Sequence, residues 1–497
     1  MAAATLLAKA LGLVRDSCIA AFFGTGMEAD AFMAASKVPT TLFDVVVGGV
    51  ISATFIPVFS GIITKHGKKQ AMEFMNKFVT MIFTVTLLIS VLGIVFADPI
   101  VNFMAPNYTG DKHELTVHLT SIMFPMIIFT GFAFSFVGFL QSMGEYNIPA
   151  IISLVSNAAI ILYFIVLGKR CGVEGLAVTM VIAWSLQMLV QVPSLIKFGY
   201  KFRLDFRLKD ENIKNALVLA GPMLISTWVQ PLYSVINSRL ASGIDGAYSS
   251  LELANRLYII VTGVFSFVVT NLIFPKLSKA NAADDADGAR ELISTSLKAV
   301  FLIILPLTAG MIILSNPITN IIYRRGEMTA EGAKNIASIL SCYSVGMLGL
   351  AVNEVLSKYF FSMNDSKTPM RNSILSMVFN IIMAYILFGL LKTQGLALAA
   401  AGGSIFNAVM NAVCMSRRQG NVIKKKELVN IIKILAGTLI MAAAVFGIYR
   451  LIYNPDGALL NQIIVCAVCG AAGVIVYAAC IILGNLDEVK RIVKRKE

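Results

Sequence analysis

Long apolar stretches, separated by short polar segments, recur along the whole chain. About 20 consecutive apolar residues let a helix cross the hydrocarbon core of a bilayer. Helices are favoured over strands because segments of alternating polarity are absent and a helix satisfies its own backbone in lipid. The pattern predicts an all-α polytopic membrane protein with fourteen transmembrane helices, near residues 2–24, 36–62, 78–97, 116–142, 147–168, 174–197, 213–242, 249–275, 293–316, 335–362, 370–391, 395–416, 428–453 and 459–484.

The basic residues between these spans are distributed unevenly, and short cytoplasmic loops are enriched in Lys and Arg. Loops after odd-numbered spans are poor in basic residues, with Arg324 and Arg325 as the main exceptions. This asymmetry predicts that both termini are cytoplasmic. The loops after even-numbered spans carry Lys65, Lys68, Lys69, Lys201, Arg203, Arg207, Lys209, Lys276, Lys279, Lys367, Arg371, Arg417, Arg418 and Lys424–Lys426.

An internal repeat divides the chain. GFLQSMGEYNIPAIISL at 138–154 resembles KYFFSMNDSKTPMRNSI at 358–374, a shift of 220 residues. This shift corresponds to six spans, so both copies have the same orientation in the membrane. Parallel repeats with a site between them are a transporter architecture. We therefore expect an N-lobe at 1–197, a C-lobe at 213–418, and an appendix of two helices at 428–484 that is a candidate groove for lipid tails.

Composition supports a membrane protein: 57% of the residues are hydrophobic, 14% are charged and the mean hydropathy is +0.79. A soluble protein carries about 25% charged residues. The net charge of +13 follows from the basic loops and indicates topology rather than nucleic-acid binding. No cleavable signal sequence is evident, and the short leader suggests that natural residues precede Met1. Cys466 and Cys469 form a CxxC without a second pair, so neither a metal site nor a cofactor is expected.

Several charged residues fall within predicted spans, where a central charge costs roughly 2.5–3.5 kcal/mol and usually marks a site. Arginine suits bidentate capture of phosphate oxygens. Arginines in corresponding spans of both lobes predict a cationic chamber for a soluble anion or for a lipid with a phosphate head group. Mutual neutralisation within a packed bundle is the alternative. The residues are Lys9, Arg15, Asp16 and Asp44 in the first lobe, and Arg239, Glu252 and Arg256 in the second.

Prolines and glycines within the spans are candidate hinges, although both are common in transmembrane helices. The candidates are Pro39, Gly48, Gly49, Gly221 and Pro222.

Two stretches carry a resemblance to a known family. KALGLVRDSCIAAFFGTGMEADAFMAASKVPTTLFDVVVGGVISATFIPVFS, at 9–60, contains the pattern basic-x2-GxxRD, FG-x-G, DAF, K-x-P and F-[IV]-P. ANRLYIIVTGVFSFVVTNLIFPKLSK, at 254–279, resembles the eighth span of the same family. The chain is similar to the MurJ (MviN) family of lipid II flippases, within the multidrug/oligosaccharidyl-lipid/polysaccharide exporter superfamily.

The resemblance implies roles for individual residues. Lys9 stands where the family often has arginine, Arg15 and Asp16 match its Arg-Asp pair, and Asp30 and Arg256 match its DAF and eighth-span motifs. These residues imply a cation-rich cavity for a diphosphate and sugar head group, with Asp44, Arg239, Glu252 and Asn255 as secondary candidates.

The sequence also departs from the family pattern. Phe43 and Asp44 replace arginines of many relatives, and Gly48–Gly49 replaces a Glu-Gly. Asn380 is present, but Ala384 follows where some members use a carboxylate for sodium. A sodium site is therefore not expected, and coupling to the membrane potential or to another cation stays open.

The predicted activity is that of a transporter rather than an enzyme. We expect alternating access to move lipid II, the undecaprenyl-diphosphate-linked muropeptide, from the inner to the outer leaflet of the cytoplasmic (inner) membrane for peptidoglycan synthesis. Expected partners are lipid II, membrane lipids and cell-wall synthesis proteins. The alternatives are a flippase for O-antigen or capsule precursors, a cation-coupled drug exporter, an enzyme acting on polyprenyl phosphates, and a passive scaffold.

Overall fold

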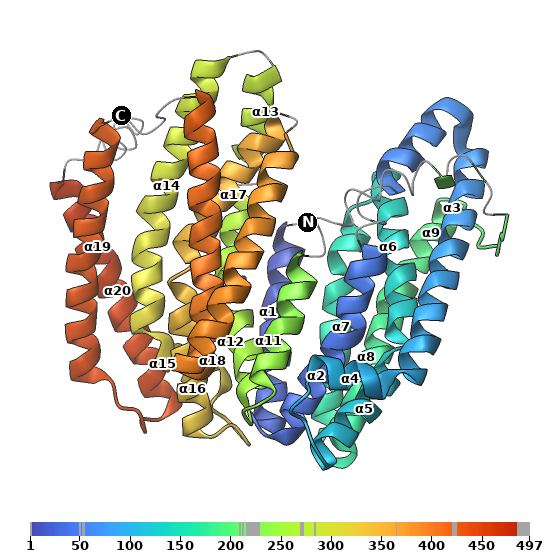
Figure 1. Cartoon of the computed structure of the whole chain (residues 1–497), viewed down its shortest axis with the longest axis horizontal. Helices are drawn as coiled ribbons and strands as arrows, with labels where there is room; N and C mark the ends of the chain where they lie inside the picture. Colours follow the sequence, from blue (N-terminus) through green and yellow to red (C-terminus); the bar gives the residue numbers. More distant parts are fainter. Residues whose placement is uncertain are drawn as a thin grey trace. The chain divides into compact units, whose positions relative to one another are not determined.

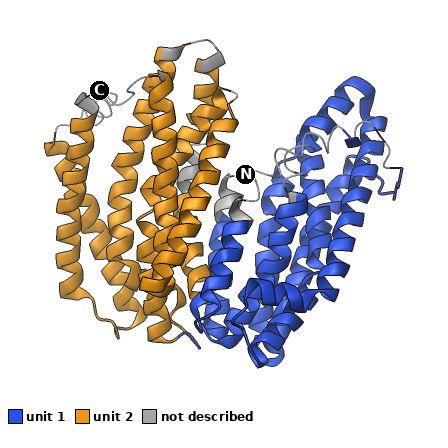
Figure 2. Ribbon diagram, viewed as in Figure 1, with its two compact units in different colours: residues 1–249, 326–328 blue, residues 250–325, 329–497 orange. Residues whose placement is uncertain are grey.

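The computed structural model describes residues 2–48, 51, 55–207, 210, 213–214, 229–268, 273–282, 285–363, 365–419 and 425–484. Among these residues the regular elements are helices (Figure 1). The chain forms two compact units, residues 1–249 with 326–328 and residues 250–325 with 329–497 (Figure 2). The predicted all-α membrane fold class is confirmed.

Unit 1 contains the helices of the first half of the chain and one further helix, α11. The short segment 326–328 joins this unit because Glu327 N–H donates to the carbonyl of Ala21 at the end of α1 (2.8 Å). The helices are α1 (Ala2–Phe23), α2 (Met27–Phe43), the π-helix η1 (Asp44–Gly48), α3 (Ile56–Val95), α4 (Ala97–Met104), α5 (Asp111–Met123), α6 (Met126–Ser142), α7 (Asn147–Val166), α8 (Gly168–Leu189), α9 (Val192–Lys197) and α11 (Val229–Ala241).

Unit 2 begins within the first turn of α12, whose residues 247–249 belong to unit 1. Its helices are α12 (Ala247–Val268), α13 (Phe274–Ala282), α14 (Ala286–Ile313), α15 (Ser315–Tyr323), α16 (Ala330–Ser344), α17 (Met347–Ser362), α18 (Lys367–Gln419), α19 (Lys425–Ile452) and α20 (Leu459–Leu483). The lobes expected at 1–197 and 213–418, with the appendix at 428–484, rest on the sequence repeat and remain predictions.

Two long helices each contain a backbone break that separates two predicted spans. In α3 the break is at Gly67, with φ of 81°, and in α18 it is at Lys392, with φ of 53°. Eight described helices are long and apolar enough to cross a membrane, and the pair α16 and α17, bent by 42°, adds a ninth. The chain is a multi-pass membrane protein, while the count of fourteen remains a prediction.

The sequence repeat is visible as the same turn in each unit. The N–H of Glu145 donates to the carbonyl of Leu140 at 2.8 Å, and the N–H of Asp365 donates to that of Phe360 at 2.9 Å. Both members of each pair differ by 220 residues, the shift of the sequence repeat. The turn joins α6 to α7 in unit 1 and α17 to α18 in unit 2. The two copies therefore share local structure as well as sequence.

Unit 1 is held together by an aromatic core between α3 and α6. Phe55 lies 5.4 Å from Phe59 and 4.9 Å from Phe78, measured between ring centroids. Phe139 of α6 meets Phe59 edge-on at 5.4 Å. Aromatic pairs in these geometries contribute about 0.5–1.5 kcal/mol beyond the area that they bury. This core fixes the framework on which the charged residues of unit 1 are arranged.

Candidate functional site

A three-residue cluster surrounds the charge in the middle of α1. The Nε and Nη2 atoms of Arg15 donate to Oδ1 of Asp16 at 3.0 and 2.8 Å, and Nη1 donates to Oδ1 of Asn157 on α7 at 3.1 Å. Asn157 also donates to the carbonyl of Ala8 at 3.1 Å. We call Arg15, Asp16 and Asn157 the α1 cluster. The orientation of the Arg15 guanidinium is therefore fixed by partners on two helices, α1 and α7.

One edge of the Arg15 guanidinium stays accessible to a ligand. The side chain of Arg15 is 20% exposed and that of Asp16 is 5% exposed. Lys9, half-buried on the same helix, lies about 9 Å from Arg15 along the axis at 1.5 Å per residue. Arginine N–H groups in a rigid fork match the geometry of phosphate oxygens. The arrangement is suited to binding an anion.

Asp30 lies in a second cluster, which joins three parts of unit 1. Its carboxylate accepts from the N–H groups of Gly246 and Ser249, both at 2.8 Å, and from Nζ of Lys112 on α5, also at 2.8 Å. Lys112 is in turn 3.0 Å from Asp245, whose side chain is 99% exposed. We call these five residues the Asp30 cluster. Asp30 itself is fully buried.

The Asp30 carboxylate caps the N-terminus of α12, where unpaired N–H groups and the helix dipole favour negative charge. The backbone before α12 approaches the turn between α1 and α2 so closely that a Cβ on Gly246 would lie 2.5 Å from the carbonyl oxygen of Thr25. Gly246 also has a φ of +70°. Glycine is therefore required here, and the contacts of Asp30 in the structure are with protein groups.

The secondary candidates and hinges are spread over several elements. Pro39 lies inside α2, and the exposed Asp44 opens the π-helical turn η1, which ends at Gly48. Such π-helical turns are rare and often occur at functional sites. Gly49, Gly221 and Pro222 lie outside the described residues.

Arg239 lies on α11 and contacts α4 in unit 1. Its Nη1 donates to the carbonyl of Phe103, and its guanidinium lies 4.9 Å from the centroid of the Phe103 ring. A cation over an aromatic face contributes about 0.5–1 kcal/mol at an exposed site. In the structure Arg239 thus fastens α11 to α4.

Glu252, Asn255 and Arg256 are all half-buried on α12. In unit 2 the hydroxyl of Tyr323 donates to the carbonyl of Leu253 at 3.0 Å, and the rings of Tyr258 and Tyr343 stack at 5.5 Å. These contacts hold α12 against α15 and α16. Arg256 therefore lies on a helix, α12, whose orientation within unit 2 is fixed by these buried tyrosines.

Five residues of the clusters were not predicted from sequence as site residues: Asn157, Lys112, Asp245, Gly246 and Ser249. Asn157 is a buried amide in an otherwise apolar span, which is a usable signal for a polar contact between helices. Lys112 lies in a stretch that reads as an acidic loop, and its burial beside Asp30 depends on tertiary packing. Among the described residues, no group of three or more His, Cys, Asp or Glu side chains is arranged to hold a metal ion.

Comparison with solved structures identifies the fold. The fold is similar to that of a structure described as "Lipid II flippase MurJ, inward closed conformation", with a TM-score of 0.81, 22% identity, and coverage of 96% of this chain and 97% of that one. It also resembles an inward-facing multidrug resistance MATE family transporter of the MOP superfamily, with a TM-score of 0.70, 15% identity, and coverage of 83% and 96%. This chain therefore shares its fold with these two solved structures.

Sequence comparisons identify the family. The family model described as "Lipid II flippase MurJ" matches residues 19–462. A probable lipid II flippase MurJ of Rickettsia prowazekii is 29% identical over 81% of this chain and 80% of its own length. The lipid II flippase MurJ of Burkholderia cenocepacia is 26% identical over 83% and 82%. This chain belongs to the lipid II flippase MurJ family, a family of transporters and not of enzymes.

Proposed function

We propose that this chain moves lipid II from the inner to the outer leaflet of the cytoplasmic membrane, with both of its termini in the cytoplasm. Membership of the lipid II flippase family supports the cargo. The observation that carries the proposal is the α1 cluster, in which Arg15 is held by Asp16 and Asn157 within an apolar helix. A partly exposed arginine in this environment is suited to the diphosphate of the lipid.

In the proposed mechanism, Asp16 offsets the charge of Arg15 when no substrate is bound. This pairing lowers the cost of holding the guanidinium among apolar helices. A diphosphate then binds the exposed edge of Arg15, with Lys9 and Arg256 providing further positive charge. Asn157 keeps the guanidinium oriented, so little rotamer entropy is lost on binding.

Alternating access then carries the head group across the membrane. An inward-negative potential favours outward movement of an anion by about 2.3 kcal/mol per charge per 100 mV. The π-helical turn η1, following Pro39 in α2, is a candidate position for bending, because prolines and π-helical turns interrupt the regular hydrogen bonds of a helix.

The test uses a cell depleted of its native flippase and follows labelled lipid II on the outer leaflet. Arg15→Ala and Arg256→Ala should each lower the rate at least tenfold at normal expression. Arg290→Ala, which removes an arginine from a surface ion pair with Asp287 on α14, and Ile259→Ala, on the exposed face of α12, are the controls. Full transport by both arginine variants contradicts the proposal.

A further inference from the structure

An extended segment after α9 lies across the surface of α3. We call Lys201–Arg207, with the sequence KFRLDFR, the 201–207 strap. The turn before it is anchored in unit 1 by Tyr200, which is 5% exposed and whose ring lies 5.6 Å from that of Phe139. The start of the strap is therefore fixed in place by the buried Tyr200.

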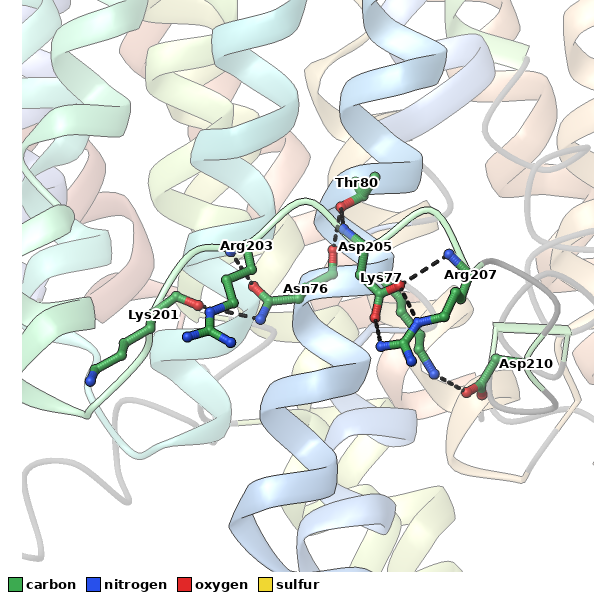
Figure 3. Close-up of polar contacts among 8 residues, drawn as sticks. All are labelled: Asn76, Lys77, Thr80, Lys201, Arg203, Asp205, Arg207 and Asp210. Carbon is green, nitrogen blue, oxygen red and sulfur yellow. Dashed lines mark hydrogen bonds and ion pairs between the residues drawn. The ribbon is translucent and has the colours of Figure 1, made fainter.

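Side chains of α3 hold the strap by its backbone. The Nδ2 of Asn76 donates to the carbonyl of Lys201 at 3.3 Å, and the Oδ1 of Asn76 accepts from the N–H of Arg203 at 3.1 Å. One helical turn further along, the hydroxyl of Thr80 accepts from the N–H of Asp205 at 2.9 Å. These contacts fall on alternate strap residues, which keeps the chain extended where it crosses α3 (Figure 3).

Successive side chains of an extended segment point to opposite sides. In the strap one row is apolar, and its members are markedly exposed: Phe202 is 49%, Leu204 50% and Phe206 64% exposed. The other row is charged: Lys201, Arg203, Asp205 and Arg207. The strap is therefore an amphipathic segment that exposes its apolar row on one side and Lys201, Arg203 and Arg207 on the other.

The strap crosses α3 where the surface of this helix changes character. Before the crossing, the exposed residues include Lys65, Lys68 and Lys69. After it they are apolar, with Leu88 at 58% and Val95 at 67%. From Asn76 to Val95 the helix rises about 29 Å, close to the ~30 Å hydrocarbon core of a bilayer. The strap thus lies at the level of one membrane–water boundary.

Positive charge dominates this level of unit 1. Asp205 is matched within the strap by Arg207, whose Nη2 lies 2.7 Å from it, and Asp210 is matched by Lys77 at 2.6 Å (Figure 3). Among the described residues, no carboxylate lies within ion-pair distance of Lys201 or Arg203. The flanking helices α3 and α9 carry four further cations, Lys65, Lys68, Lys69 and Lys197, against one exposed carboxylate, Glu73, which interacts with Arg207. The sequence orientation places this loop in the cytoplasm, beside the anionic leaflet.

We propose that the 201–207 strap is an interfacial anchor that binds anionic phospholipid head groups of the inner leaflet. Lys201 and Arg203 contact lipid phosphates, while Phe202, Leu204 and Phe206 enter the acyl boundary. Alternation of aromatic and cationic side chains at one depth fits a lipid surface better than a water-soluble polyanion, which would leave the three apolar side chains in water. The anchor sets the height of unit 1 in the membrane.

The test measures which lipid touches the strap. Trp184 and Trp228 are replaced by Phe in the full chain, and Phe206→Trp then supplies a single fluorophore in nanodiscs containing phosphatidylglycerol and phosphatidylcholine. Brominated phosphatidylglycerol should quench this Trp more strongly than brominated phosphatidylcholine. Lys201→Gln with Arg203→Gln should abolish the preference, because each cation near an anionic surface contributes about a fivefold preference. Quenching by phosphatidylcholine should remain.

The control is Arg290→Gln with Lys334→Gln, which removes two cations from unit 2 and should leave the preference intact. Equal quenching by the two lipids with the native charges overturns head-group recognition. Absence of quenching by either lipid overturns membrane placement and points to a soluble partner. As a second measurement without Phe206→Trp, phosphatidylglycerol co-purifying with the chain should fall several-fold in the Lys201/Arg203 variant, and an unchanged amount contradicts the proposal.

Discussion

The α1 cluster and the Asp30 cluster both place a buried carboxylate beside a cation in unit 1, yet their geometries differ. Asp16 accepts two hydrogen bonds from the guanidinium of Arg15, which keeps an accessible edge. Asp30 is fully buried and accepts from two backbone N–H groups and one ammonium. We infer that the first orients a binding group and the second fastens residues 246–249 to α2 within unit 1. A buried charge alone does not distinguish these roles; the identity of its partners does.

The largest effect is expected from Asp30→Ala. This change leaves Lys112 and two N–H groups without their buried acceptor, and breaking a buried pair costs about 3–5 kcal/mol. The free energy of unfolding, measured by denaturant titration in mixed micelles, should fall by this amount.

Asp245→Ala is the matched control because it removes the other carboxylate of Lys112. Its side chain is 99% exposed, and an exposed pair contributes about 0–1 kcal/mol. Equal losses from the two variants would show that Asp30 is not the residue that fastens the cluster.

The next largest effect concerns the α1 cluster. Asn157→Leu removes the acceptor of Arg15 Nη1, and a hydrogen bond to a charged group contributes about 1.5–3 kcal/mol. Outer-leaflet delivery of labelled lipid II should fall about tenfold or more. Ser156→Ala, one residue earlier on α7, does not touch Arg15 and should transport normally. Normal transport by Asn157→Leu would mean that Asp16 suffices to orient Arg15.

The next prediction concerns backbone strain at Lys392, which lies outside both clusters. Lys392 has a φ of 53° at the break in α18, a conformation that glycine adopts without steric cost. Lys392→Gly should stabilise the chain by up to about 1 kcal/mol. Thermal unfolding in detergent checks this, with Lys334→Gly in helix α16 as a control that should destabilise. A loss of stability at position 392 would contradict a strained backbone there.

The smallest effect is expected at Asp205, a carboxylate outside both clusters whose side chain is 14% exposed. Hydrogen bonds from the Arg207 side chain and N–H lower the pKa of Asp205 from 3.8 to about 2. Because the pKa in the folded chain is below the ordinary value, the stabilisation is complete above about pH 4 and is lost as the pH falls through about 2.

Hydrogen exchange of the 198–207 segment, corrected for intrinsic rates, should therefore show unchanged protection from pH 8 to pH 4. Arg207→Gln should shift the loss of protection upward, toward the ordinary pKa of an aspartate. Loss of protection near pH 5 in the unaltered chain would contradict the pairing of Asp205 with Arg207.

The all-α membrane fold was predictable because apolar length acts locally along the chain. The 220-residue repeat likewise reappears as the same turn after α6 and after α17. The residues that pair with the buried charges were harder to predict from the sequence. Arg15 could be singled out by its cost in lipid, but Asn157 lies 142 residues away and reaches it only through the packing of α1 on α7. Lys112 meets Asp30 through the same kind of long-range packing.

Lipid II affinity measured on two matched variants tests the account most directly. Arg15→Gln and Lys112→Gln each remove one cation, the first from the α1 cluster and the second from the Asp30 cluster. We predict that Arg15→Gln lowers the affinity of the folded chain for lipid II at least tenfold, whereas Lys112→Gln lowers stability and keeps the affinity of the folded fraction. Unchanged affinity in Arg15→Gln, or lost affinity with full stability in Lys112→Gln, would contradict the account.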